Sequence, residues 1–376
     1  MAPFIFLLLA YSGLNAYVCL RGWQALPPVP GLRITYLVVY IILTYGYFTF
    51  IVLHKYVPYG LAKCIDIICS AWPVIFLYLL MAVLLIDLLR IVNHFLPFFP
   101  AGLQQPTAQT KLLVLAAVCC LLAGIFAAGY HRFNHPKTVH LALTIDKELL
   151  ERPLRMVMVS DLHIGYAIGP KRLQSYVDKI NALQPELVVI VGDLLNSQLE
   201  PVQRMHMDEI LRKIEAPLGR YMVLGNHEYI GGGLEERIAY LEGAGLRVLR
   251  DELAELPIGL SLVGRDDRSN AHRASLDSLM NGRDPRRAYI LLDHQPYHLE
   301  EAAQQGLDVM LCGHTHSGQI WPASLLVRRM YELPQGYMQR NDTHYYVSSG
   351  LGIWGPPFRI GTDSELVLID LQAPSK

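Results

Sequence analysis

Residues 155–163 read Arg155-Met156-Val157-Met158-Val159-Ser160-Asp161-Leu162-His163, an apolar run that passes directly into a polar cluster. A short apolar run bounded by polar residues is typical of a buried strand. Four further strand-like runs end in the same way, at Val191 before Gly192-Asp193, Leu224 before Gly225-Asn226-His227, Leu292 before Asp293-His294 and Cys312 before Gly313-His314. Ligands of open α/β sheets gather at the carboxyl ends of the strands. The sequence therefore predicts that five strands deliver Asp, Asn and His to one site.

Around these five strands, the pattern from about Thr138 onward alternates between strands and helices. The predicted strands are Arg155–Val159, Leu187–Val191, Tyr221–Leu224, Leu260–Val263, Tyr289–Leu292, Val309–Leu311, His344–Val347 and Leu366–Leu371. The predicted helices are Pro170–Leu183, Met207–Ile214, Leu234–Glu242 and Tyr297–Ala303. Alternation of this kind within one domain predicts an α/β layered architecture.

The first third of the chain has a different composition. Residues 1–137 contain eight Lys or Arg and only two acidic residues, whereas the remainder is charged like an ordinary globular domain. We therefore expect a membrane domain over 1–137 and a catalytic domain over 138–376. The first part holds four apolar runs, each close to the roughly 20 residues that a membrane-spanning helix needs: residues 3–20, 34–53, 67–86 and 112–130.

Four transmembrane helices are the expected arrangement, with three or fewer as the alternative. A cleaved signal peptide would explain only the first run, which lacks a basic segment before it and a small-residue cleavage site after it. Four spans make the chain a multi-pass protein of the cell membrane and place the catalytic domain on the same side as the N-terminus. The net charge of −1 gives no indication of a nucleic-acid partner.

The side of the membrane that holds the catalytic domain is predicted from charge and cysteine usage. Four basic residues flank the spans on each side, Lys55, Lys63, Arg132 and Lys137 against Arg21, Arg33, Arg90 and Lys111. Lys147, Arg152 and Arg155, just downstream, shift the balance toward the catalytic side, which favours a cytoplasmic location. Cys312 is the only cysteine of residues 138–376, so this part forms no internal disulfide.

The residue types at the five strand ends predict a pair of divalent metal ions. Carboxylates suit hard cations, imidazole adds affinity for transition metals, and the set contains no thiolate. Asp161 and His163 alternate and can direct two donors at one ion, Asp193 is the candidate for a bridging carboxylate, and Asn226 offers a neutral oxygen. The imidazoles are those of His294, His314 and His316.

These five blocks resemble the signature motifs of the calcineurin-like metallophosphoesterases, over roughly Met156 to Ile369. The resemblance implies a four-layer αββα sandwich with two metals, most commonly Mn²⁺, with Fe, Zn or Mg as alternatives. By the same resemblance, Asp161, His163, Asp193 and His316 would hold the first metal, and Asp193, Asn226, His294 and His314 the second. Asn196 and Glu228 depart from the commonest pattern, which places Asp at both positions. We expect Asn196 to alter the surroundings of Asp193, and Glu228 to shift the carboxylate that orients His227.

The reaction expected of such a centre is attack on phosphorus by a water that bridges the two metals and is deprotonated by them. His227 is not required as a ligand and would hydrogen-bond the leaving oxygen as a general acid. Asp193 and His227 are therefore the predicted catalytic residues.

The segments after the last metal motif bear on the substrate. Ser348 to Arg359 resembles a loop of membrane-associated relatives, some of which hydrolyse lipid phosphates or pyrophosphates, such as UDP-2,3-diacylglucosamine pyrophosphatase. Apolar residues between Ile320 and Val327 precede Arg328 and Arg329, which would either contact a lipid headgroup or be solvated arginines on a packed loop. We expect a lipid-linked phosphate or pyrophosphate ester as substrate. The alternatives are soluble nucleotides or phosphoproteins, and a receptor or scaffold with a structural metal site.

Overall fold

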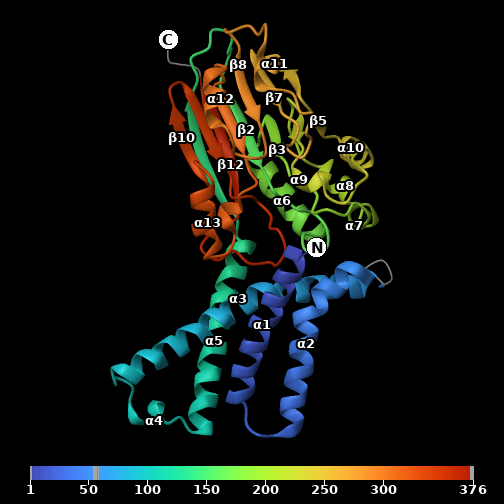
Figure 1. Cartoon of the computed structure of the whole chain (residues 1–376). Coiled ribbons are helices and arrows are strands. Elements are labelled where there is room, and N and C mark those ends of the chain that lie inside the picture. Colours follow the sequence, from blue (N-terminus) through green and yellow to red (C-terminus); the bar gives the residue numbers. More distant parts are fainter. Residues whose placement is uncertain (1, 54–56, 58, 373–376) are drawn as a thin grey trace. The chain divides into compact units, whose positions relative to one another are not determined.

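The structure of the chain is a computed structural model that describes residues 2–53, 57 and 59–372. The chain forms two compact units, Met1–Ala128 and Gly129–Lys376, and Figure 1 traces both. The proposed domain boundary at 137/138 lies at the start of strand β1 (Lys137–Thr144).

The first unit is helical. Its long helices are α1 (Ala2–Ala25), α2 (Pro30–Leu53), α3 (Tyr59–Phe95) and the greater part of α5 (Ala108–Asn134), with the short α4 (Ala101–Gln104) before α5. Each of the four predicted runs lies within one long helix. Over the described residues, three segments are long and apolar enough to cross a membrane: Ile5–Ala25, Cys64–Phe95 and Ala108–Asn134.

In α2, the apolar helical stretch is shorter than these three and covers Pro30–Gly46. Three apolar helices of this length indicate a membrane protein. The fourth span, the orientation and the multi-pass arrangement remain predictions. Lys55 was one of the basic residues counted for orientation, and it lies outside the described residues.

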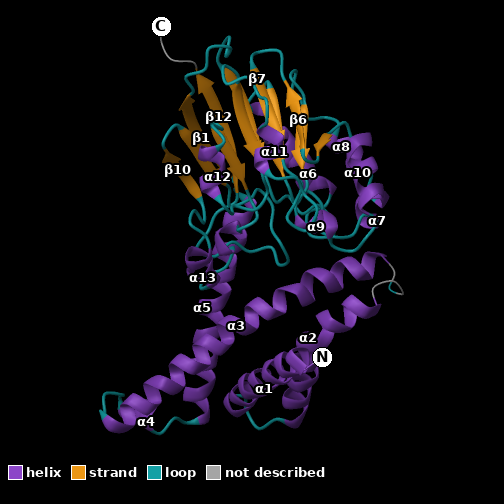
Figure 2. Ribbon diagram, turned by 45° about the horizontal axis from the view of Figure 1, so that its top comes forward, coloured by secondary structure: helices purple, strands orange, loops and turns teal. Residues whose placement is uncertain are grey.

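The second unit contains two six-stranded sheets (Figure 2). The first has the order β1, β12 (Glu365–Gln372), β2 (Leu154–Val159), β3 (Leu187–Val191), β4 (Arg220–Val223) and β5 (Arg247–Leu249). The second has the order β10 (Gly336–Arg340), β11 (Thr343–Val347), β9 (Val309–Cys312), β8 (Ala288–Leu292), β7 (Leu260–Gly264) and β6 (Glu252–Glu255). The central strands β2, β3 and β4 are parallel, as are β7, β8, β9 and β11.

Alternation along the central strands builds the layers. In β2, Met156 and Met158 point into a core shared by both sheets, whereas Val157 and Val159 point the other way into a core shared with helices. These are α6 (Pro170–Ala182), α7 (Glu200–Arg204), α8 (Met207–Leu211) and α10 (Leu234–Gly243). On the far side of the second sheet, Tyr289 and Leu291 of β8 pack with α11 (Leu276–Met280) and α12 (Leu299–Gln304). The predicted four-layer αββα sandwich is confirmed, because each fully buried strand offers one face to the other sheet and one to helices.

The eight predicted strands are all present, and four were missed. β5 has only three residues and β6 four, below the length at which alternation can be recognised. β1 and β10 are edge strands whose exposed positions weaken the apolar signal. Two predicted helices had wrong ends: the one expected over Met207–Ile214 ends at Leu211, and the one expected from Tyr297 begins at Leu299.

Candidate metal centre

The structure brings the predicted ligands together at the carboxyl ends of strands from both sheets. Asp161 and His163 follow β2, Asp193 follows β3, and Asn226 opens the short helix α9 (Asn226–Tyr229) after β4. His294 follows β8, and His314 and His316 follow β9. Backbone bonds join the blocks, with the His163 N–H donating to the Asp193 carbonyl at 3.0 Å. One edge of the sandwich therefore collects donors from five strands.

The backbone at this edge adopts a conformation that side chains other than glycine rarely take. Five of the seven predicted ligands have positive φ, with values of 54° at Asp161, 49° at His163, 52° at Asp193, 71° at His314 and 47° at His316. Such residues are uncommon, and they cluster where the surrounding structure enforces a functional geometry. The sharp change of direction after each strand is what lets neighbouring residues of one block point into the same space.

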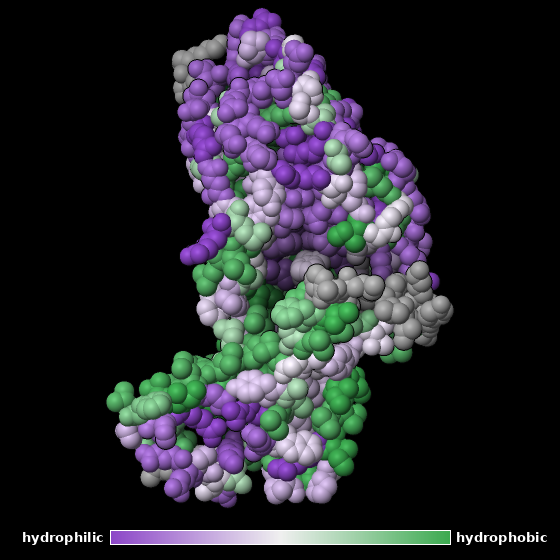
Figure 3. Space-filling view, in the orientation of Figure 1, coloured by the Kyte–Doolittle hydropathy of each residue, from purple (hydrophilic) through white to green (hydrophobic). Residues whose placement is uncertain are grey.

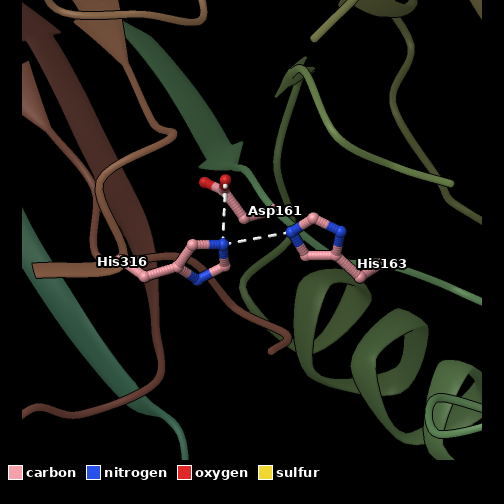
Figure 4. Close-up of side chains that lie close together, drawn as sticks. All are labelled: Asp161, His163 and His316. Atoms are coloured by element: carbon pink, nitrogen blue, oxygen red, sulfur yellow. Dashed lines mark hydrogen bonds and ion pairs between the residues drawn. The ribbon is translucent and has the colours of Figure 1, made fainter. Parts of the chain in front are cut away.

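The first group of donors is Asp161, His163 and His316, whose side chains converge in Figure 4. His163 Nε2 lies 3.1 Å from His316 Nε2, and His316 Nε2 lies 3.4 Å from Asp161 Oδ1. Ligands about 2.1 Å from one ion are separated by about 3 Å when the bonds are at right angles. These separations are therefore those of ligands around a common cation.

The second group is Asp193, His294 and His314. Asp193 Oδ2 lies 3.2 Å from His294 Nε2, and the same oxygen lies 3.8 Å from His163 Nε2 of the first group. One carboxylate oxygen thus faces imidazoles of both groups. The other oxygen of Asp193 accepts the backbone N–H of His227 at 2.8 Å, which fixes the carboxylate in this orientation.

Three buried side-chain atoms of the predicted ligands make no hydrogen bond among the described residues: Asn226 Oδ1, His163 Nδ1 and His294 Nε2. Of these, His294 Nε2 faces Asp193 Oδ2 at 3.2 Å. The opposite ring nitrogen of His294, Nδ1, lies 2.8 Å from the carbonyl oxygen of Val191. Because a carbonyl only accepts, Nδ1 carries a proton, and the neutral form of the ring, which metal binding requires, would direct the Nε2 lone pair into the site. A buried amide oxygen without a hydrogen bond is costly unless a cation binds it, so Asn226 Oδ1 beside these imidazoles fits a metal ion.

Electrostatics favour cation binding at the same atoms. Burial lowers the pKa of His163, His314 and His316 below the ordinary value, which keeps these imidazoles neutral and their lone pairs available. Burial acts in the same direction on His294, but the charge of Asp193 outweighs it and raises that pKa. Burial would raise the pKa of Asp193, yet the neighbouring His294 holds it well below its usual value.

His227 and Glu228 differ from expectation. The His227 Nδ1–H donates to the backbone carbonyl of Asn196, so a carbonyl and not a carboxylate orients this ring. The Glu228 carboxylate instead accepts the backbone N–H groups of Asp193, Leu195 and Gly225 at 3.0, 2.9 and 2.7 Å. Burial, followed by the charge of Asp193, raises the pKa of Glu228 to about 7. The expected role of Glu228 was wrong: it joins the second and third motifs through their backbones.

Glycines of the motifs are required by close approach of the ligands, as Gly225 and Gly313 show. A Cβ at Gly225 would overlap the carboxylate of Asp193, and a Cβ at Gly313 would lie 2.5 Å from Asp161 Oδ2. Real Cβ atoms do not approach an oxygen so closely, so each glycine makes room for a metal-ligand candidate.

Residues 154–318 match the calcineurin-like phosphoesterase family. The chain is 31% identical, over 66% of its length, to an uncharacterized metallophosphoesterase of Helicobacter pylori strain J99, of which it covers 68%. The chain belongs to the calcineurin-like metallophosphoesterases.

This metallophosphoesterase is also 32% identical, over 70% of its length, to the transmembrane protein with metallophosphoesterase domain of Danio rerio. The chain spans 63% of that relative's own length. Among solved structures it is similar to a dimetal phosphatase from Danio rerio, with 13% identity, a TM-score of 0.33, and coverage of 54% of this chain and 89% of that one. This likeness is too low to carry an inference about function.

Three arginines that the sequence motifs did not single out support the site. Asp293, which precedes His294, lies 3.4 Å from Arg265 and 3.2 Å from Arg273. Arg359 is fully buried and donates to the backbone carbonyls of Gly350, Gly352 and His316 at 2.6–3.1 Å. Burial lowers the pKa of Arg359 to about 10, which still leaves it charged at neutral pH. The signal available for Arg359 was a lone arginine ending a Gly- and Pro-rich loop, which does not specify a buried position.

Replacing Arg359 by methionine is expected to lower the melting temperature of the second unit by about 6–12 °C. Three buried carbonyls would lose their hydrogen-bond donor, which lowers the free energy of unfolding by a few kcal/mol in total. Differential scanning fluorimetry of the detergent-solubilised chain measures the shift. Arg155→Met is the control, since Arg155 is half exposed and pairs with Asp370 only at the surface. A shift at Arg359 no larger than that at Arg155 would show that these hydrogen bonds contribute little.

The two predicted substrate arginines, Arg328 and Arg329, lie in the last turn of helix α13 (Ala323–Met330), and both are exposed. The packed loop considered as the alternative for this apolar segment is therefore a helix. Contact of either arginine with substrate remains a prediction.

Proposed function

We propose that the chain is a metal-dependent phosphoester hydrolase anchored in a membrane and carrying two divalent ions. The observation that carries the proposal is the placement of Asp193, whose Oδ2 faces His294 at 3.2 Å and His163 at 3.8 Å. A carboxylate oxygen that faces imidazoles of both groups is the arrangement that a bridged metal pair requires. Family membership and the unpartnered Asn226 Oδ1 support it.

The proposed ligands are divided between the two ions by their position around Asp193. Asp161, His163 and His316 would hold one ion with Asp193, and Asn226, His294 and His314 would hold the other with the same carboxylate. When bound, such ions lower the pKa of coordinated water and neutralise phosphoryl oxygens. Mn²⁺ is the proposed metal, with Fe, Zn or Mg as alternatives, because the donors are carboxylate, amide and imidazole with no thiolate.

His227 is the proposed general acid. Its Nδ1–H is held by the Asn196 carbonyl, so the proton that the imidazolium can release is on Nε2. Transfer of that proton to the leaving oxygen produces the neutral ring with its Nδ1–H bond intact. His227 also lies within 4.8 Å, donor atom to donor atom, of His163 and Asp193. A role as a metal ligand is therefore the competing assignment for this ring.

The proposed substrate is a phosphate or pyrophosphate ester of a lipid, held at the membrane surface. The support is the surroundings of His227, whose ring lies 6.2 Å from that of Trp354, a tryptophan that is 60% exposed. An exposed aromatic beside the general acid suits an amphipathic leaving group. Hydrolysis of soluble nucleotides or phosphoproteins, and a receptor or scaffold with a structural metal site, are the alternatives. We propose the cytoplasmic side for the catalytic unit on the charge and cysteine pattern.

One experiment separates these functions. The full chain is purified in detergent, stripped with a chelator, and assayed with and without added Mn²⁺ on a lipid phosphodiester, a lipid pyrophosphate and a soluble bis-aryl phosphodiester. We expect no hydrolysis without metal, recovery with Mn²⁺, and a preference in kcat/KM for a lipid ester. Recovery with preference for the soluble ester would contradict the lipid substrate, and no hydrolysis of any ester by the metal-loaded chain would favour the scaffold.

A further inference from the structure

Helix α13 presents an apolar face that the second unit does not cover. The side chains of Trp321, Leu325, Leu326 and Met330, named here the α13 face, are 43%, 52%, 66% and 64% exposed. Leu326 and Met330 are four residues apart and share one side of the helix. Figure 3 shows hydrophobic residues gathered on the surface over α13. Apolar groups contiguous at a surface indicate an interaction site.

All charged side chains of helix α13 are positive. Arg328 and Arg329 are exposed in its last turn, and the helix contains no acidic residue. A short helix with large apolar residues on one side and arginines beside them is the pattern of helices that lie in the headgroup layer of a bilayer. Arginine also binds phosphate oxygens in a bidentate manner, which suits anionic lipid headgroups.

Contacts within the second unit connect the start of α13 to α5, a candidate membrane-spanning helix. The Trp321 N–H donates to the Ile360 carbonyl at 2.8 Å, and the Arg359 N–H donates to the Gly129 carbonyl at 3.0 Å. A Cβ at Gly129 would lie 2.8 Å from the Ile360 side chain, so helix α5 packs directly on the segment that contains Arg359 and Ile360. Gly129 belongs to the last turns of α5, and α5 is one of the helices long and apolar enough to cross a membrane.

We expect the last turns of α5 to leave the apolar layer, because His131 and Arg132 follow two and three residues after Gly129. The start of α13 is thus joined to the membrane-exit end of α5 through two backbone hydrogen bonds. We propose that the α13 face lies in the interfacial layer of an anionic bilayer, with Arg328 and Arg329 on lipid phosphates. The surface is lipid-binding, and this holds whether or not the metal centre hydrolyses a lipid.

The docked helix is connected to the metal centre at both ends. At its start, Gly318 of the 3₁₀ turn η2 (His316–Gly318) packs so closely on Ser324 that a Cβ would overlap the Ser324 backbone. At its end, the Tyr331 ring lies 6.2 Å from that of the predicted ligand His314. The same face therefore fixes the height of the metal centre above the headgroups, and this would bring a surface-held phosphate within reach.

Photocrosslinking in a bilayer tests the proposal without using activity. Full-length chains with p-benzoylphenylalanine in place of Leu326 are reconstituted in nanodiscs of phosphatidylcholine and phosphatidylglycerol, irradiated, digested and analysed by mass spectrometry for lipid adducts. Leu121, 64% exposed on α5, is the positive control within a candidate span, and Glu252, exposed on β6, is the control on the same unit. Replacement of exposed side chains leaves the core of either unit unchanged.

We expect lipid adducts at position 326 with a yield at least about tenfold above that at 252. The yield at 326 should fall several-fold in pure phosphatidylcholine and in an R328Q/R329Q background. Adducts at 121 without adducts at 326 would overturn the proposal. Adducts at 326 with a second copy of the chain in place of lipid would also overturn it and identify the face as a protein interface.

Discussion

Asp193→Asn is expected to lose both metal ions and to reduce kcat/KM by at least about 10³-fold, since metals supply several kcal/mol of transition-state stabilisation and each 1.36 kcal/mol is a factor of ten. The amide can direct only one oxygen, and it carries no charge to hold two cations. It also loses the ion pair that Asp193 Oδ2 makes with His294. Metal content by elemental mass spectrometry and hydrolysis of a soluble diester measure the two effects on the same sample.

Asp308→Asn is the matched control for this change. Asp308 is also a buried aspartate, whose Oδ2 accepts the Tyr289 N–H at 2.8 Å and whose Oδ1 lies 3.4 Å from Lys147 Nζ. It lies outside both groups of donors, so its amide should retain two metals and most of the activity. An Asp193→Asn variant with two metals and full activity would contradict the shared-carboxylate assignment.

His227→Gln is expected to retain both metals and to lower kcat by about 10²–10⁴-fold on an alkyl phosphoester, the range that general acid catalysis contributes. The glutamine amide can still donate to the Asn196 carbonyl, but it cannot release a proton to the leaving oxygen. An ester with a p-nitrophenolate leaving group needs little protonation, so the loss on that substrate should be smaller. Parallel kinetics on the two esters, with metal content of the variant, measure the effect.

Two outcomes would contradict the role of His227 as a general acid. Loss of one metal from His227→Gln would make the ring a ligand, as its proximity to His163 and Asp193 allows. An equal loss of kcat on the alkyl and the aryl ester would show that the proton is not given to the leaving group. Tyr297→Phe is a suitable control, because Tyr297 contacts Tyr331 and not His227.

Strand–helix alternation was sufficient to predict an α/β layered domain and the convergence of the donors, whereas the four-layer αββα sandwich was implied by the resemblance of the motifs to a family. The convergence follows from apolar runs that end in polar clusters and from the rule that strand ends meet at one edge, which places Asp161 beside His316 although 155 residues separate them. The support around the donors was not predictable in this way. Glu228 acts on backbone N–H groups and Asn196 acts through its carbonyl, and backbone partners leave no pattern in the side chains.

Helix α13 shows a second limit. Its eight residues are exposed on most sides, so the apolar positions do not mark a face buried in the unit's own core. The 3.6-residue periodicity of apolar residues identifies a helix when its apolar face is buried in the core. When the apolar side of a short helix faces outward, the same residues resemble an apolar loop, as the segment between Ile320 and Val327 did.

The central claim is that one carboxylate joins two metal ions, and anomalous diffraction tests it most directly. Crystals of the full chain grown with Mn²⁺ are measured on either side of the manganese absorption edge. We expect two anomalous peaks about 3.5–4 Å apart, with Asp193 between them, Asp161, His163 and His316 around one, and Asn226, His294 and His314 around the other. A single peak, or two peaks of which only one contacts Asp193, would contradict the account.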